Sequence, residues 1–189
     1  MVKILLIDHH DSFTYNLAAL LRSFRDVKID IIYPEKANIE EIKIYDKLVF
    51  SPGPGLPSEY PFMHQVLHRY KKTKSILGVC LGHQAIGEYF GARLTNHKQV
   101  HHGRVKQLSI TEPNSLIYKN IPDKSDVGLY HSWYIDRSGF PNELRITALS
   151  NDGIIMSMEH KEYDIHSVQF HPESFITVHG REMIGNWIN

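Results

Sequence analysis

The N-terminal half of the chain alternates short aliphatic or β-branched runs with longer amphipathic segments, and this alternation limits the possible folds most strongly. The runs have the composition of strands and span residues 3–8, 27–33, 47–51 and 75–79. Apolar residues recur at helical spacing in the segments between them, over residues 12–24 and 62–70. Strands joined by helices in this way favour a sheet of parallel strands. We therefore predict an α/β fold with a mixed, mostly parallel open sheet flanked by helices.

The second half is richer in strands. After Gly91 the predicted strands are short, and they span residues 105–110, 127–131, 145–149, 154–159 and 165–170. An amphipathic helix is predicted to close the chain over residues 175–188. With 189 residues and no linker-like change in composition, the sequence indicates one domain over residues 1–189.

Charge and cysteine content exclude several classes of protein. The 21 basic residues equal the 21 acidic ones, which gives no net attraction toward nucleic acid or an anionic membrane surface. The single cysteine cannot form an internal disulfide. No apolar stretch approaches the roughly 20 residues that a membrane span needs, and no signal-peptide pattern is present. We expect a cytoplasmic protein that binds neither nucleic acid nor membranes.

Cys80 follows the predicted strand 75–79 and precedes a helical stretch over residues 83–90. Gly78 and Gly82 permit a sharp turn around it, so the segment has the form of a nucleophile elbow with cysteine in place of serine. The backbone dipoles at a helix N-terminus favour the thiolate. A lone cysteine is usually only a small buried apolar residue, so this candidate nucleophile depends on other residues.

His171 and Glu173 follow the last predicted strand, on either side of Pro172. Residues two apart in extended backbone point the same way, so the imidazole and the carboxylate can be neighbours. A thiolate nucleophile needs a base that later protonates the leaving amine, and the base needs an orienting partner. In a chain with 13 histidines, such a pair taken alone is more often structural.

Residues Pro52 to Gly55 read Pro-Gly-Pro-Gly and follow another predicted strand. Ligands of open parallel sheets bind at the carboxyl ends of the strands. The backbone N–H groups of Gly53 and Leu81 are candidates for an oxyanion hole that would stabilise a tetrahedral acyl intermediate. Taken alone, the segment is equally compatible with an ordinary turn.

Three segments together closely resemble the signatures of class I (triad) glutamine amidotransferases. They are residues 51–55 (SPGPG), 78–84 (GVCLGHQ) and 169–174 (QFHPES). Residues 11–17 (DSFTYNL) narrow the resemblance to the small subunits of anthranilate synthase and aminodeoxychorismate (para-aminobenzoate) synthase. The resemblance covers essentially the whole chain, and it implies a flavodoxin-like fold of three layers.

The resemblance also implies roles for individual residues. Cys80 would be the nucleophile, His171 the base and acid, and Glu173 the orienting carboxylate. Glutamine would be held by Gly53, Pro54, Gly55, Gln84, Ser132 and Trp133. Attack on the side-chain amide would release ammonia and leave a glutamyl thioester for water to hydrolyse.

The family works with a partner, so the resemblance implies that the ammonia passes to a chorismate-binding synthase subunit. The product would be anthranilate or 4-amino-4-deoxychorismate. This chain would need no cofactor of its own, whereas the partner subunit is expected to use Mg²⁺. His97, His101 and His102 raise the alternative of a metal site, but no nearby cysteine or carboxylate completes one, so we predict no metal.

Two positions depart from the family pattern, since His9 stands where asparagine is common and Trp133 where leucine is frequent. Two other functions stay open. A hydrolase of the same fold could act on another γ-glutamyl or peptide bond, but Gln84 and Ser132 argue against it. A catalytically silent module could merely bind a partner, and the intact set of Cys80, His171 and Glu173 argues against that.

Overall fold

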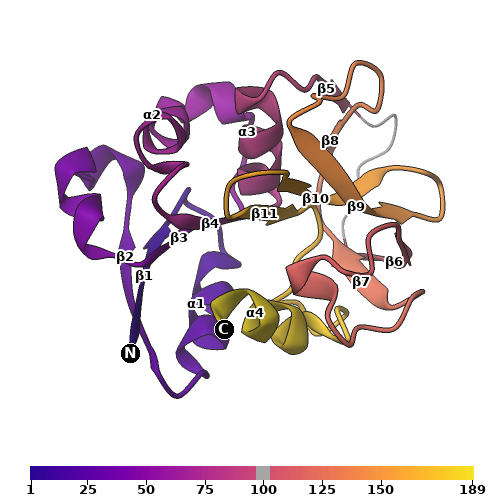
Figure 1. Ribbon diagram of the computed structural model, residues 1–189, viewed down its shortest axis with the longest axis horizontal. Coiled ribbons are helices and arrows are strands. Elements are labelled where there is room, and N and C mark those ends of the chain that lie inside the picture. The colour runs from indigo at the N-terminus through magenta and orange to yellow at the C-terminus, as the bar shows by residue number, and fades with distance from the viewer. Residues whose placement is uncertain (97–102) are drawn as a thin grey trace.

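The structure is a computed structural model of the chain, and it describes residues 1–96 and 103–189. A nine-stranded sheet runs through the molecule in the order β2-β1-β3-β4-β11-β10-β9-β6-β7 (Figure 1). Its first five strands are parallel. They are β1 (Val2–Ile7), β2 (Val27–Ile32), β3 (Lys47–Phe50), β4 (Ser75–Val79) and β11 (Ile165–Val168).

The remaining strands of the sheet pair in antiparallel fashion. They are β10 (Ile155–His160), β9 (Leu144–Ser150), β6 (Arg104–Ile110) and β7 (Asp126–Leu129). A separate two-stranded ribbon pairs β5 (Leu94–Asn96) with β8 (Trp133–Ile135). The predicted α/β class with a mixed sheet and a strand-rich second half is therefore confirmed.

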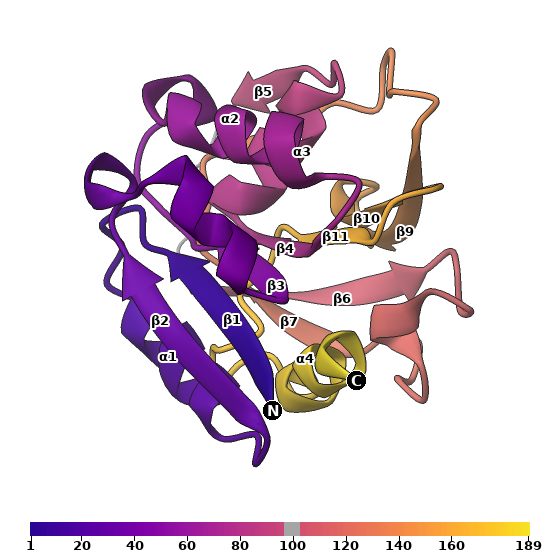
Figure 2. The same cartoon turned by 60° about the vertical axis from the view of Figure 1, so that its left-hand side comes forward.

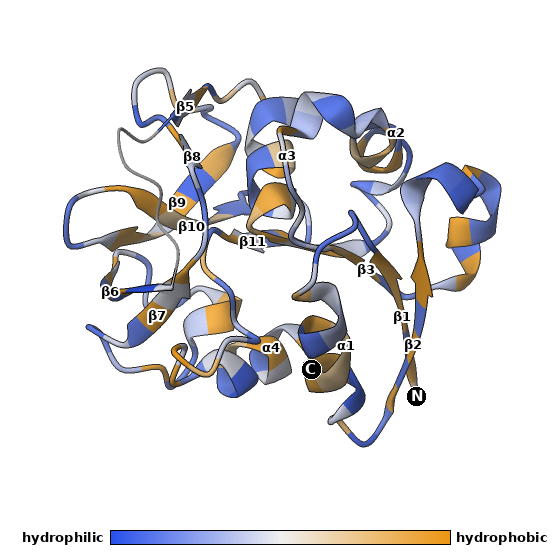
Figure 3. Cartoon of the chain, turned by 180° about the vertical axis from the view of Figure 1, so that it is seen from behind, coloured by the Kyte–Doolittle hydropathy of each residue, from blue (hydrophilic) through white to orange (hydrophobic). Residues whose placement is uncertain are grey.

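Helices cover both faces of the parallel half (Figures 1 and 2). One face carries α1 (Thr14–Arg22) and α4 (Gly180–Ile188), and the other carries α2 (Pro61–Tyr70) and α3 (Leu81–Tyr89). Short 3-10 turns lie at Pro34–Lys36, Ile39–Ile44, Pro57–Glu59 and Leu116–Tyr118. Ile4 of β1 belongs to one core and Leu5 to the other, because successive strand residues face opposite ways. Strands β1 and β3 are therefore hydrophobic along most of their length (Figure 3).

Two predicted helix boundaries were wrong. The first helix was expected to be capped by Ser12, but α1 starts at Thr14 with Phe13 at the N-cap position, and the Asp11 carboxylate accepts the N–H of Phe13 (2.7 Å). The closing helix starts at Gly180 rather than at residue 175. The residues before it form turns, in which the Thr177 hydroxyl donates to the His171 carbonyl (2.6 Å). This loop therefore anchors the backbone of His171.

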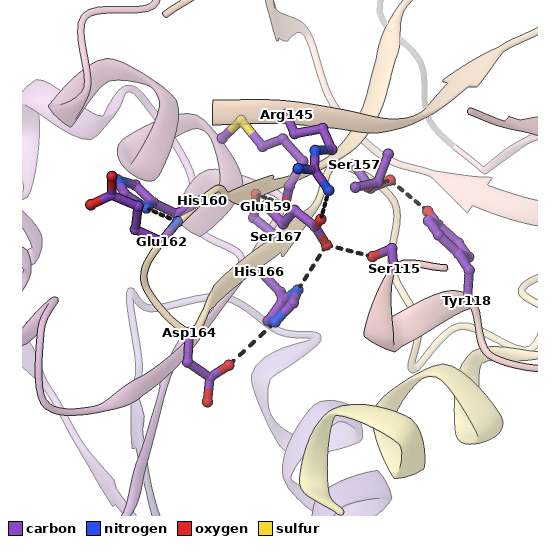
Figure 4. A network of polar contacts seen from close by, with 12 residues as sticks. Ser115, Tyr118, Arg145, Ser157, Glu159, His160, Glu162, Asp164, His166 and Ser167 are labelled. Atoms are coloured by element: carbon purple, nitrogen blue, oxygen red, sulfur yellow. Dashed lines mark hydrogen bonds and ion pairs between the residues drawn. The ribbon is translucent and has the colours of Figure 1, made fainter. Parts of the chain in front are cut away.

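A network of polar side chains fixes the junction between the parallel and antiparallel halves (Figure 4). Glu159 of β10 accepts a hydrogen bond from Ser115 (2.7 Å) and pairs with Arg145 of β9 (3.3 Å). His166, on the neighbouring strand β11, lies 3.7 Å from Glu159 and 3.2 Å from Asp164. The hydrogen bond from His166 lowers the pKa of Asp164. These contacts hold β11 in register at the end of the strand remote from His171.

Within the described residues, no helix is both long enough and apolar enough to cross a membrane.

Candidate active site

Cys80 occupies a sharp turn between β4 and α3. Its φ of 52° and ψ of −99° lie outside the regions that a residue with a side chain ordinarily adopts. The backbone N–H of Cys80 donates to the carbonyl of Val168 in β11 (2.9 Å), and its carbonyl accepts from the backbone N–H of Gln84 in α3 (3.1 Å). Such a conformation costs on the order of 1–3 kcal/mol and persists only where the surrounding structure enforces it. Here β3 and β11 hold β4 from both sides.

The turn requires glycine at position 82. A Cβ atom at Gly82 would lie 2.6 Å from both the Cβ and the carbonyl oxygen of Phe50. The first turn of α3 therefore packs directly against the end of β3. As a result, Cys80 stands at the carboxyl edge of the parallel strands with 6% of its surface exposed.

The structure brings His171 and Glu173 together as a buried pair. Nδ1 of His171 lies 2.7 Å from Glu173 Oε1, and their side chains are 2% and 0% exposed. The rings of Phe13 and Tyr130 each pack against the imidazole with centroids 5.0 Å apart. Contact with the carboxylate assigns a proton to Nδ1, which leaves Nε2 as the nitrogen available for chemistry.

The charge state of His171 is set by its neighbours. Burial lowers the pKa of this imidazole, but the Cys80 sulfur and the Glu173 carboxylate outweigh burial and raise the pKa to about 10. At neutral pH His171 is therefore an imidazolium beside Cys80. An imidazolium in this position can supply a proton to a leaving group.

A cavity of about 220 Å³ opens at Cys80. It is lined by Gly53, Pro54, Gly55, Cys80, Leu81, Gln84, Tyr130, His131, Ser132 and Trp133. The lining contains every residue that the sequence assigned to glutamine or to the oxyanion hole. Tyr130 and His131 were not among those assignments, although their place directly before Ser132 could have indicated them.

Gly53 and Leu81 lie side by side at the wall of the cavity. A Cβ atom at Gly53 would be 2.5 Å from Leu81 Cδ2 and 2.7 Å from the Cβ of His9. Only glycine lets the loop after β3 approach the start of α3 this closely. The two residues predicted to form the oxyanion hole are therefore neighbours, although they are far apart in the sequence.

His9 supports this loop from behind and does not line the cavity. It is fully buried, and Ser51 Oγ lies 2.8 Å from its backbone N and 3.1 Å from its Nδ1. The Ser51 hydroxyl also contacts the carbonyl of Pro52 (2.6 Å). Burial lowers the pKa of His9 to about 4, so the ring is neutral near pH 7.

A larger cavity, of about 520 Å³, lies at the other end of α3. Its walls include Lys71, Tyr89, Glu143, His160 and Tyr163. It contains no nucleophilic cysteine, and its lysine and glutamate side chains balance one another in charge. The smaller cavity is therefore the candidate active site, because a strained nucleophile lines it and the buried His171 acts on that nucleophile.

No group of three potential metal ligands occurs among residues 1–96 and 103–189. His97, His101 and His102, which raised the alternative of a metal site, lie outside the described residues.

Comparison with known proteins extends these observations. The family model for class-I glutamine amidotransferases matches residues 5–189. A Haemophilus influenzae protein, provisionally named anthranilate synthase component II, is 41% identical over 187 residues, which cover 99% of this chain and 96% of that protein. Anthranilate synthase component 2 of Lactococcus lactis is 40% identical, over 98% of this chain and 93% of that protein.

A solved structure shares the fold at high similarity. The crystal structure of a Thermoplasma acidophilum protein, provisionally named as part of GMP synthase, superposes with a TM-score of 0.89 at 26% identity. The match covers 100% of this chain and 92% of that one.

Proposed function

The chain belongs to the class-I glutamine amidotransferase family, and from this premise we propose that it hydrolyses glutamine and supplies the ammonia to a chorismate-binding synthase subunit. One observation carries the proposal. Cys80 lines the same cavity as all the residues assigned to glutamine, and the buried pair of His171 and Glu173 acts electrostatically on its sulfur.

Glutamine would bind with its side-chain amide against Cys80. The cavity of about 220 Å³ is smaller than the roughly 300–1,000 Å³ of sites for drug-sized ligands, which suits a single amino acid. Gly53, Pro54 and Gly55 would form one wall, and Ser132 with Trp133 the opposite one. Gln84 would contribute from the first turn of α3.

The first step would form a bond between the Cys80 sulfur and the amide carbon. Negative charge would move onto the amide oxygen, where the N–H groups of Gly53 and Leu81 are proposed to stabilise it. Removal of one such donor typically costs about 3–4 kcal/mol of transition-state stabilisation. The imidazolium of His171 would donate its Nε2 proton to the leaving nitrogen, so that ammonia departs and a glutamyl thioester is left.

The second step would reverse the direction of proton transfer. Neutral His171 would accept a proton from water as that water attacks the thioester, and the products would be glutamate and the restored thiolate. Glu173 would hold the imidazole in place through both steps. Cys80 supplies the nucleophile and His171 the proton, so the chemistry calls for no cofactor in this chain.

The partner is proposed from the names of the relatives. Two relatives that match nearly the whole chain are designated component II or component 2 of anthranilate synthase, which favours anthranilate over 4-amino-4-deoxychorismate as the product. We place the docking face beside the cavity. Phe175, two residues after Glu173, is 94% exposed, and Val178 and Tyr15 are 64% and 60% exposed. Exposed apolar side chains that gather on one surface mark protein interfaces, and we propose that these three contribute to such a surface.

Ammonia release from glutamine tests the proposal. The purified chain is assayed alone, with a chorismate-binding subunit of anthranilate synthase, and with one of aminodeoxychorismate synthase, beside a Cys80→Ala control. Stimulation by one partner that disappears in the control supports the amidotransferase and names its product. Hydrolysis of other γ-glutamyl compounds in preference to glutamine would indicate the hydrolase alternative. An intact complex without glutamine-dependent ammonia would indicate a silent module.

A further inference from the structure

Two buried amide side chains connect the Cys80 sulfur to the opposite wall of the cavity. Gln169 Nε2 lies 3.6 Å from Cys80 Sγ. Gln84 Nε2 lies 3.2 Å from Gln169 Oε1 and 2.8 Å from the carbonyl oxygen of Trp133. Gln169 is 0% exposed and Gln84 is 3% exposed. The four groups form a continuous path of contacts along the cavity.

The backbone carbonyl at one end determines the direction of every hydrogen bond in this path. A carbonyl oxygen can only accept, so Gln84 must present its NH₂ group to Trp133. The same NH₂ group donates to the oxygen of Gln169. Gln169 must then present its own NH₂ group to the sulfur. A reversal of either amide would place two acceptors or two donors in contact.

We propose that Gln169 is a further catalytic residue, which donates a hydrogen bond to the Cys80 thiolate, and that Gln84 is a positioning residue that holds Gln169 in the donating orientation. This inference rests on the proposed function and gives the sulfur a hydrogen-bond donor in addition to the nearby charge of His171. Gln84 donates both amide hydrogens within this path, to Trp133 and to Gln169, so only its oxygen is available to a substrate.

Burial strengthens the hydrogen bond from Gln169 to the Cys80 sulfur. Hydrogen bonds to a charged acceptor are stronger than bonds between neutral groups, and they gain further strength away from water. The donor also fixes where the sulfur lies relative to the amide carbon that it attacks. When the bond to carbon forms, charge leaves the sulfur for the oxyanion hole, so Gln169 chiefly stabilises the resting thiolate.

The path also ties the nucleophile to the wall that would hold glutamine. The Trp133 carbonyl lies 2.8 Å from Nδ1 of His131 as well, so this segment of the cavity wall is fixed from two sides. Displacement of the wall would move Gln84 and, through Gln169, the donor at the sulfur. Gln84 thus acts on the chemistry without touching the reacting atoms.

The chain has one cysteine, so alkylation by iodoacetamide reports on Cys80 alone. The rate is measured from pH 5 to pH 10 by mass spectrometry for the wild-type chain and for Gln169→Met, which keeps the length of the side chain but removes the donor. We expect the midpoint of the profile to rise by about one pH unit, equivalent to a tenfold smaller thiolate fraction below the midpoint. Gln65→Met, on the exposed face of α2, is the matched control and should leave the profile unchanged.

Gln84→Met should move the midpoint in the same direction by a smaller amount. The double variant should move it no further than Gln169→Met alone, because the two residues act through one contact. Independent, additive shifts would refute the role of Gln84, and an unchanged midpoint in Gln169→Met would refute the donor. If Gln169→Met does not fold, Gln169→Glu keeps the acceptor for Gln84 and sets a carboxylate oxygen against the sulfur. Its midpoint must then rise by more than one pH unit.

The assay separates this inference from the proposed function. Protection of wild-type Cys80 from alkylation by glutamine tests the function, whereas the shift between variants tests the donor. A shift without protection would retain the donor and refute the glutaminase. Protection without a shift would support the glutaminase and refute the donor.

Discussion

Two buried histidines should make the protein sensitive to mild acid. Burial lowers the pKa of His9 to about 4, and burial followed by the nearby His131 lowers that of His83 to about 3. Both side chains are 0% exposed. In the unfolded chain each would titrate near 6.5. The stability that they contribute is therefore fully present above pH 6.5 and is lost as the pH falls toward 4.

The expected loss follows from proton linkage. Below pH 6.5 each such histidine costs about 1.4 kcal/mol of unfolding free energy per pH unit, which amounts to about 2 kcal/mol at pH 5. The raised pKa of His171 instead stabilises the folded chain as the pH falls. From pH 7 to pH 5 this gain in unfolding free energy is only about 1 kcal/mol. A net loss of about 3 kcal/mol is large for a domain whose total stability is typically about 5–15 kcal/mol.

His9→Asn isolates one of the two contributions. Asparagine keeps a polar group that can reach the Ser51 hydroxyl, but it does not titrate. Urea unfolding at pH 7, 6 and 5 should show a loss of stability that is smaller by about 2 kcal/mol in the variant than in the wild-type chain. His68→Asn, at an exposed position of α2, should match the wild-type chain. An equal loss in His9→Asn and the wild-type chain would contradict the lowered pKa of His9 in the folded chain.

Three further outcomes are expected. Gly82→Ala should destabilise the chain by about 1–3 kcal/mol in thermal unfolding, because the new methyl group meets Phe50; an unchanged Tm would contradict this close packing. Glu173→Gln should lower the pKa of His171 from about 10 and move the alkaline limb of the pH–rate profile for ammonia release to lower pH; a fixed limb would contradict the pairing. Trp133→Leu keeps the carbonyl that accepts from Gln84, so it should alter KM for glutamine but not the pH midpoint for alkylation of Cys80.

Much of the fold follows from local sequence. The runs that form β1, β3 and β4 are apolar because both faces of the sheet are covered there, so hydrophobic pattern alone places them. The ribbon of β5 and β8 was missed, since strands of three residues are too short to produce a pattern. The start of α4 was misplaced because the residues before it bind to β7, far away in sequence: the N–H of Gly128 donates to the Thr177 hydroxyl, and the N–H of Val178 donates to the carbonyl of Asp126.

Some features of the candidate site can likewise be identified from local sequence, and others cannot. Cys80, His171 and Glu173 were identifiable because the chemistry demands particular residue types within short, recognisable segments. The neutral charge of His9 and the link from Gln169 to Cys80 were not, since each depends on burial and on contacts between residues far apart in sequence. Sequence reveals which groups can react, but only the folded chain shows which amide faces the sulfur.

Covalent labelling tests directly whether the cavity at Cys80 binds glutamine. A glutamine analogue that carries a chloroketone in place of the side-chain amide would set an electrophilic carbon against the Cys80 sulfur. We predict one label per chain on Cys80, mapped by mass spectrometry, with glutamine protecting against it and Glu173→Gln slowing it. Labelling that glutamine does not prevent, or labelling elsewhere with Cys80 left intact, would contradict the assignment of this cavity as a glutaminase site.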